Sequence, residues 1–238
     1  MKTLSRLFIS PRDPSLAVAR EWDPDTRTDS FISWERLRRD VADLRVRLMD
    51  EPGGGWVLLT EDAYAFAVGL LALWHSGRYA ISPPNRQPEA LRKLQLRAGG
   101  VLCDRPDWFS IGKSIHPLLS GVVGTDPDQL AELSSSSPGI ELYTSGTTGG
   151  EKPVLKKISH LEDEVSEIES LWGDRVSESV FFSTASHQHL YGLLFGILWP
   201  LGAGHVFQTQ TFLHAGESVP RMIDTRGCVL ATVPTHLK

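Results

Sequence analysis

Apolar residues recur at helical spacing in the stretch that follows Ser33. A helix through this stretch places four of them on one face: Leu37, Val41, Leu44 and Leu48. Ser33 has a side chain that commonly caps helix N-termini. Three glycines end the pattern at 53–55, and the apolar run 56–59 then predicts a buried strand. Residues 1–32 show no such period, and we predict that they are irregular.

Helices and strands continue to alternate after this point. Asp62 can cap a second helix, which runs to about Ser76 and is apolar on nearly all sides, as buried helices are. Gly77 suits the left-handed position that ends a helix, and a strand over 79–82 follows. The next two elements are a helix and a strand, at about 88–98 and 101–103. Strands that alternate with helices predict an α/β fold of layered sheets with packed helices.

The second half of the chain gives weaker signals. Residues 104–137 are irregular and predict a loop-rich connection. Ser159 and Glu162 have the spacing of a capping box at the start of a helix. The other expected elements are a helix at 193–201 and strands at 154–158, 180–183, 205–208 and from 228 onward. We therefore expect three parts, namely an irregular segment 1–32, a first α/β subdomain 33–133, and a second α/β subdomain 134–238 that is incomplete at its C-terminus.

Composition narrows the class of protein. A hydrophobic content of 41% and a charged content of 22% are those of an ordinary globular protein. The formal net charge of −5 gives no basic surface for nucleic acid. Cys103 and Cys228 form neither a disulfide framework nor a paired metal motif, which predicts a reducing, cytoplasmic location. The longest apolar runs, 63–74 and 190–203, are too short or too interrupted to span a bilayer.

The strongest chemical signal is a run of hydroxyls and glycines that ends in a lysine. Its backbone N–H groups can form a concave nest for anions, and the lysine adds a positive charge, so the run suits a polyphosphate. It is not a Walker A loop, because no lysine directly follows a glycine and precedes Ser or Thr. A surface hairpin of the same composition is the alternative. The candidate residues are Thr144, Ser145, Gly146, Thr147, Thr148, Gly149 and Lys152.

This run resembles the phosphate loop of the adenylate-forming superfamily, which includes acyl- and aryl-CoA synthetases, AMP-ligases, luciferases and peptide-synthetase adenylation domains. In the family pattern Y-T-S-G-[ST]-T-G-x-P-K-G, residues 143–149 match without a gap and Lys152 falls on the lysine. Glu151 and Pro153 depart from it, standing where the family has Pro and Gly. The resemblance implies ATP and Mg²⁺ as cofactors, with the loop holding the β- and γ-phosphates and Lys152 balancing their charge.

A second match follows the expected strand at 180–183. His189-Leu-Tyr-Gly192 fits the H-x-x-G step of the same family. The resemblance implies that His189 lies beside the carboxylate of the acid substrate, and that Tyr191 and Gly192 shape the acid pocket. A structural role for His189 stays open, and His187 could share the site. The His187–His189 pair lacks a third ligand at a recognisable spacing, so we predict no metal site.

The resemblance implies ligation in two steps, with Lys152 and His189 as catalytic residues. A carboxylic acid attacks the α-phosphorus of ATP, and the acyl group then passes to a thiol of CoA or a carrier protein. The resemblance spans about 33–235. The family's Y-G-x-T-E segment, ribose-binding aspartate and C-terminal lysine do not occur in the 238 residues, so we expect an N-terminal fragment that is inactive alone. A nucleotide-binding module without catalysis and a non-enzymatic interaction domain are the alternatives.

Overall fold

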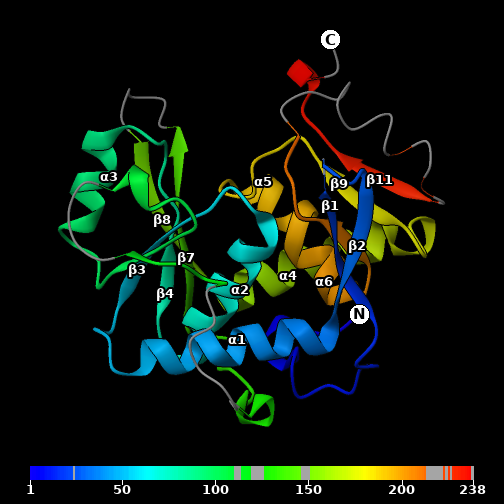
Figure 1. Cartoon of the computed structure of the whole chain (residues 1–238), viewed down its shortest axis with the longest axis horizontal. Helices are drawn as coiled ribbons and strands as arrows, with labels where there is room; N and C mark the ends of the chain where they lie inside the picture. Colours follow the sequence, from blue (N-terminus) through cyan, green and yellow to red (C-terminus); the bar gives the residue numbers. More distant parts are fainter. Residues whose placement is uncertain are drawn as a thin grey trace.

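Two β-sheets built mainly from parallel strands organise the chain (Figure 1). This computed structural model describes residues 1–23, 25–109, 114–118, 126–145, 151–212, 222, 225 and 227–236, with only the backbone at 144, 145 and 151. The first sheet has the order β6 (Ser114–Ile115), β5 (Val101–Cys103), β3 (Gly55–Leu59), β4 (Tyr79–Ile81), β7 (Pro138–Ser145), β8 (Glu151–Lys157). The second has the order β11 (Cys228–Ala231), β9 (Val180–Ser183), β10 (Val206–Gln208), β1 (Ala17–Asp23), β2 (Thr28–Ser33). Only β8 and β2 run antiparallel to their neighbours in these orders.

One helix, α2 (Ala63–His75), lies between the two sheets (Figure 1). Every residue from Ala63 to Trp74 is buried, which explains its lack of a polar face. Asp62 caps this helix by accepting a hydrogen bond from the Ala65 N–H at 2.7 Å. Gly77 follows the helix with φ +72°, the left-handed conformation predicted for this position. The sequence therefore predicted both ends of α2.

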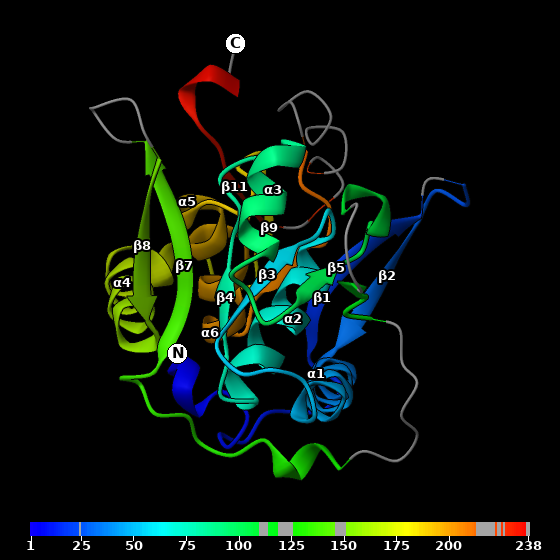
Figure 2. The ribbon, with the colours of Figure 1, turned by 90° about the vertical axis from the view of Figure 1, so that its left-hand side faces the viewer.

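The first sheet has a second covering helix on its other face. Figure 2 looks onto the sheet from the side of α3 (Pro88–Gln95). Side chains of β3 alternate between the two faces, as strand geometry requires. Leu58 joins the core around α2, whereas Val57 and Leu59 pack with Leu91 and Leu94 of α3. Both faces of β3 are thus apolar and covered.

The remaining helices pack around α2 and against the sheets. α1 (Trp34–Met49) begins at Ser33, whose Oγ accepts from the Arg36 N–H at 3.2 Å, and it buries the predicted stripe. α4 (Ile158–Trp172) follows β8. After β9 the chain forms α5 (Leu190–Leu193), the π-helical segment η5 (Leu194–Leu198) and α6 (Trp199–Ala203) in succession. No helix in the described ranges is long and apolar enough to cross a membrane.

Three sequence-based expectations need correction. Residues 1–32 are not irregular, because they contain β1 and β2, and β1 pairs with β10 from the far part of the chain. The sheets do not divide at residue 134, because β7 and β8 extend the first sheet. Ser159 does not cap α4: the helix starts at Ile158, and Glu162 accepts from the backbone and hydroxyl of Ser5 at 2.7 and 2.6 Å.

Candidate functional site

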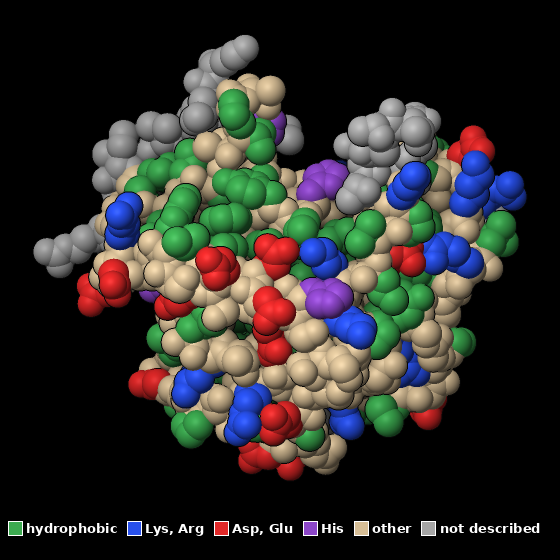
Figure 3. Space-filling model, turned by 180° about the vertical axis from the view of Figure 1, so that it is seen from behind, with side chains coloured by type: hydrophobic (Ala, Val, Ile, Leu, Met, Phe, Trp, Pro, Cys, Tyr) green, Lys and Arg blue, Asp and Glu red, His purple; other side chains and the backbone are tan. Residues whose placement is uncertain are grey.

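The segments that follow β3, β4 and β9 meet at a seam between the two sheets. Ser82, directly after β4, donates through Oγ to the Gln188 carbonyl at 2.8 Å. The Gln188 side chain donates to the Thr60 carbonyl, directly after β3, at 3.1 Å. All three segments leave the carboxyl ends of parallel strands, where α/β sheets commonly bind ligands. Seen from behind, the upper surface of the molecule is hollowed (Figure 3).

His187 is a buried support of this seam. Its Nε2 lies 3.1 Å from the Thr60 carbonyl and its Nδ1 lies 3.3 Å from Thr211 Oγ1, so the ring joins both halves. The ring of Phe66 packs against it at a centroid distance of 4.9 Å. Burial lowers the pKa of His187 to about 4, which keeps the imidazole neutral at pH 7. These contacts give His187 a structural role beside the site.

His189 lies two residues further on and is exposed. It occupies the N-cap position of α5, with its backbone N–H bonded to the Ser186 carbonyl at 3.1 Å. Gly192, in the next turn, allows two backbone segments to approach closely. A Cβ at this position would lie 2.1 Å from the Ser186 carbonyl oxygen, so only glycine lets α5 pack this closely on the loop. The loop therefore presents His189 outward.

Tyr191 connects α5 to the segment that follows β11. Its hydroxyl donates to the Thr232 carbonyl at 3.3 Å, and its ring lies 4.7 Å from that of Phe195. The side chain is 41% exposed, so one face remains open to a ligand. Trp199, at the start of α6, is fully buried and donates to Glu169 Oε2 at 2.6 Å.

The predicted phosphate loop joins β7 to β8. The two strands pair so that Thr144 faces Lys152 and Ser145 faces Glu151, and Lys152 is exposed. Gly146, Thr147, Thr148 and Gly149 lie outside the described residues, as do the side chains of Thr144 and Ser145. Because β7 lies beside β4, and Ser82 after β4 contacts Gln188, the hairpin end and the His189 segment belong to the same edge of the molecule.

Known proteins resemble this chain in sequence and in fold. No protein-family model matches the chain. Bovine (Bos taurus) mitochondrial malonate–CoA ligase ACSF3 is 25% identical over 209 residues, which cover 79% of this chain and 35% of that protein. The chain therefore spans about a third of this relative's length.

Solved structures extend the likeness over almost the whole chain. A fatty acyl-adenylate ligase from L. pneumophila, bound to acyl adenylate and pyrophosphate, has a TM-score of 0.72 at 18% identity, covering 94% of this chain and 42% of that one. MatB from Rhodopseudomonas palustris has a TM-score of 0.74 at 20% identity, covering 98% and 49%. The N-terminal subdomain of Klebsiella oxytoca NpsA has a TM-score of 0.71 at 18% identity, covering 94% and 58%.

The chain has the fold of the N-terminal part of adenylate-forming enzymes. This confirms the resemblance drawn from the phosphate loop and the H-x-x-G step, and it confirms the predicted fold class.

Within this adenylate-forming fold, the structure adds residues that sequence reasoning missed. Thr184 follows β9 and Thr232 follows β11, and their Oγ1 atoms lie 2.7 Å apart. His236 Nδ1 lies 3.1 Å from Thr184 Oγ1, which extends the chain of hydrogen bonds. Each threonine is the first residue after a parallel strand, and that position is the signal by which they could have been found.

Asp62 is a further titratable group at the seam. It lies two residues after Thr60. Burial raises the pKa of its carboxyl to about 6, although the hydrogen bond from the Ala65 N–H opposes this shift. Its backbone N–H donates to Asp104 Oδ2 at 3.1 Å. Among the described residues, no three His, Cys, Asp or Glu side chains are grouped to hold a metal ion.

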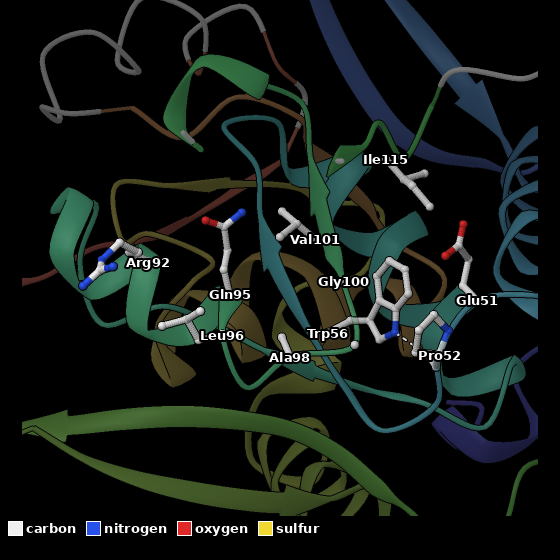
Figure 4. Close-up of a pocket in the computed structure, with 11 residues that line it drawn as sticks. Glu51, Pro52, Trp56, Arg92, Gln95, Leu96, Ala98, Gly100, Val101 and Ile115 are labelled. Atoms are coloured by element: carbon white, nitrogen blue, oxygen red, sulfur yellow. Dashed lines mark hydrogen bonds between the residues drawn. The ribbon is translucent and has the colours of Figure 1, made fainter. Parts of the chain in front are cut away.

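A separate hollow of about 320 Å³ lies at the opposite end of the first sheet (Figure 4). Trp56 forms part of its wall and donates from the indole N–H to the Pro52 carbonyl at 2.9 Å. Arg92 and Glu51 lie on different sides of it. None of the predicted site residues lines this hollow, so it is not part of the candidate site.

Proposed function

We propose that the chain belongs to an ATP-dependent acid–thiol ligase, in which it binds the carboxylic acid and the polyphosphate of ATP. The supporting observation is the seam: in an adenylate-forming fold, Ser82 after β4 bonds to Gln188 beside His189, and β7, which leads into the hairpin, pairs with β4. A ligase of this class joins the acid to AMP and then transfers the acyl group to CoA or to a carrier protein. Because the chain spans 35% of the bovine ligase, this activity is a proposal about the whole enzyme.

Phosphoryl chemistry of this kind needs positioning and charge balance more than covalent help. We assign the phosphate loop, from Thr144 to Gly149, to the β- and γ-phosphates as the pyrophosphate leaves. Lys152 is exposed opposite Thr144 and supplies a point charge there. Mg²⁺, which the family resemblance implies as a cofactor, would supply further neutralisation of the phosphate charge.

The acid is assigned to the region between α5 and the segment after β11. His189 is exposed at the start of α5, and an imidazole can donate a hydrogen bond to a carboxylate or to the anhydride oxygen. Tyr191, half-open to solvent and tied to Thr232, forms one side of the proposed pocket. Gly192 brings α5 close enough to Ser186 for this arrangement. A cytoplasmic location, supported by the two free cysteines, is part of the same proposal.

ATP–pyrophosphate exchange by the whole enzyme tests this function, because the 238 residues alone are expected to be inactive. We would supply fatty acids, aryl acids and malonate one at a time, because the bovine relative is named for malonate. Lys152→Ala is expected to lower the exchange rate about 10²- to 10³-fold, as the loss of one preorganised charge-stabilising group does. Binding of MgATP without exchange would favour the nucleotide-binding module. Failure to bind MgATP or any of the acids would contradict the proposed function.

A further inference from the structure

Three hydrogen-bonded side chains join the end of β9 to the segment after β11. Thr184 Oγ1 lies 2.7 Å from Thr232 Oγ1 and 3.1 Å from His236 Nδ1. Thr184 is 4% exposed, so its hydroxyl depends on these two partners for its hydrogen bonds. The Tyr191 hydroxyl donates to the carbonyl of the same Thr232 at 3.3 Å, which puts these side chains next to the proposed acid pocket. We call Thr232, Thr184 and His236 the Thr–Thr–His chain.

The direction of these hydrogen bonds fixes the proton of the imidazole. Among the described residues, the other acceptor near the Thr232 hydroxyl is the Val233 carbonyl, at 3.5 Å, which is the limit for a hydrogen bond. Thr232 therefore donates to Thr184, and Thr184 donates its single hydrogen to His236 Nδ1. A ring that accepts at Nδ1 carries its proton on Nε2. His236 thus presents an N–H donor on the side of the ring away from Thr184.

This donor is held in place and is not used by the fold. His236 is half-buried in the short helical turn η6 (Pro234–His236). Its ring is held by Thr184, and its backbone N–H bonds to the Val233 carbonyl at 2.9 Å. No group in the described part of the chain pairs with its Nε2. A fixed donor without a partner is what the recognition of a ligand requires.

We infer that His236 is a specificity-determining residue of the proposed acid site, and that the acid it selects carries a second oxygen acceptor. The carboxylate that reacts lies toward His189, and Nε2 of His236 donates to the second group, which is a carboxylate, carbonyl or phenol oxygen. A plain hydrocarbon acid leaves this donor without a partner, which disfavours its binding. This inference rests on the proposed function, since it presupposes that the acid binds between α5 and the segment after β11.

ATP–pyrophosphate exchange by the whole enzyme tests the inference with matched pairs of acids, 3-hydroxybenzoate against benzoate and malonate against butyrate. By kcat/KM, the wild type should prefer the acid with the additional oxygen. His236→Phe should lower this preference about 10-fold or more, the effect of losing one hydrogen-bond donor that is withdrawn from water. His236→Gln keeps an N–H donor and should restore part of the preference. A purely structural role would lower kcat/KM equally for both acids of a pair, and this result would overturn the inference.

The matched control is His160→Phe, which removes an exposed imidazole from the first turn of α4. Its preference between the acids should stay within about twofold of the wild-type value. Should His236→Phe not fold, Thr184→Val removes the hydroxyl that holds the ring and should also lower the preference, whereas Thr184→Ser keeps this hydroxyl and should retain it.

The outcomes separate the inference from the proposed function. If the wild type activates plain fatty acids, benzoate or butyrate in preference to the acids with a second oxygen, only the inference is overturned. An unchanged preference in His236→Phe would overturn it as well. If no acid supports exchange and MgATP does not bind, the proposed function fails and this inference fails with it.

Discussion

The two ends of the first sheet are held in different ways. At the amino end, Arg78 donates to the Pro52 and Ser76 carbonyls, and Trp56 also donates to the Pro52 carbonyl. These bonds join only segments that flank the first sheet. At the carboxyl end, Ser82 and Gln188 bond across to the other sheet. The same strands thus present a packed end and an end where polar groups of both halves converge. This difference, and not the size of a hollow, is the reason why we place the proposed site at the carboxyl end.

The largest effect is expected from changing the contact that brings α5 against the seam. Gly192→Ala places a Cβ 2.1 Å from a backbone oxygen that cannot move aside, so the free energy of unfolding should fall by more than about 3 kcal/mol. Gly196→Ala, in the same helical stretch, meets only ordinary contacts at 3.5 Å and should be neutral or stabilising by up to about 1 kcal/mol. Urea unfolding of both variants measures the contrast. Equal stabilities would show that α5 does not depend on this approach.

The next effect is acid sensitivity caused by His187. The pKa of about 4 in the folded protein lies below the ordinary value of 6.5, so folding favours the neutral ring. This stabilisation is complete above pH 6.5 and is lost as the pH falls toward 4, by at most about 3 kcal/mol at 1.36 kcal/mol per pKa unit. His187→Gln should flatten the fall of the unfolding free energy over this window. His189→Gln, exposed two residues away, is the control and should retain the fall.

A smaller effect of opposite sign is expected from Asp62. The pKa of its carboxyl is raised from 3.8 to about 6, so its contribution is complete below pH 3.8 and is lost as the pH rises through 6. Asn caps helices about as well as Asp. Asp62→Asn should therefore be more stable than wild type by about 1 kcal/mol at pH 7.5, after allowance for solvent screening, with no difference near pH 4. Thermal unfolding at both pH values measures this, and a variant less stable at pH 7.5 would contradict it.

Local signals account for most of the fold that the sequence predicted. The apolar stripe of α1, the all-apolar α2 and its flanking Asp62 and Gly77 are each contained within one short stretch. β1 was missed because its pattern is not local: it holds the charged Arg20, which is buried by pairing with Asp29, and its place in the sheet is set by β10. The start of α4 was misplaced because Glu162 is engaged by Ser5 from the other end of the chain.

The candidate site likewise contains residues that a local motif marks and residues that only contacts between distant segments bring together. Motif spacing marked Lys152, His189 and Gly192, and the structure explains Gly192 by a backbone approach that no motif describes. The motif assigned His189 to the acid and left a share in the site open for His187, because the burial of His187 depends on Thr60 and Thr211, which follow other strands. The position of Thr184 and Thr232 after strands could mark each residue as a candidate, but their contact requires the parallel pairing of β9 with β11, which the sequence does not reveal. The assignments of Lys152 and His189 to phosphate and acid remain predictions.

Hydrogen–deuterium exchange with and without saturating MgATP tests the central claim most directly, because it reports on both ends of the first sheet in one experiment. The account predicts that MgATP slows exchange in β7 and β8, at 138–145 and 151–157, and leaves exchange at 92–101, beside the amino-end hollow, unchanged. Protection confined to 92–101 would contradict the account, as would the absence of protection anywhere in the hairpin.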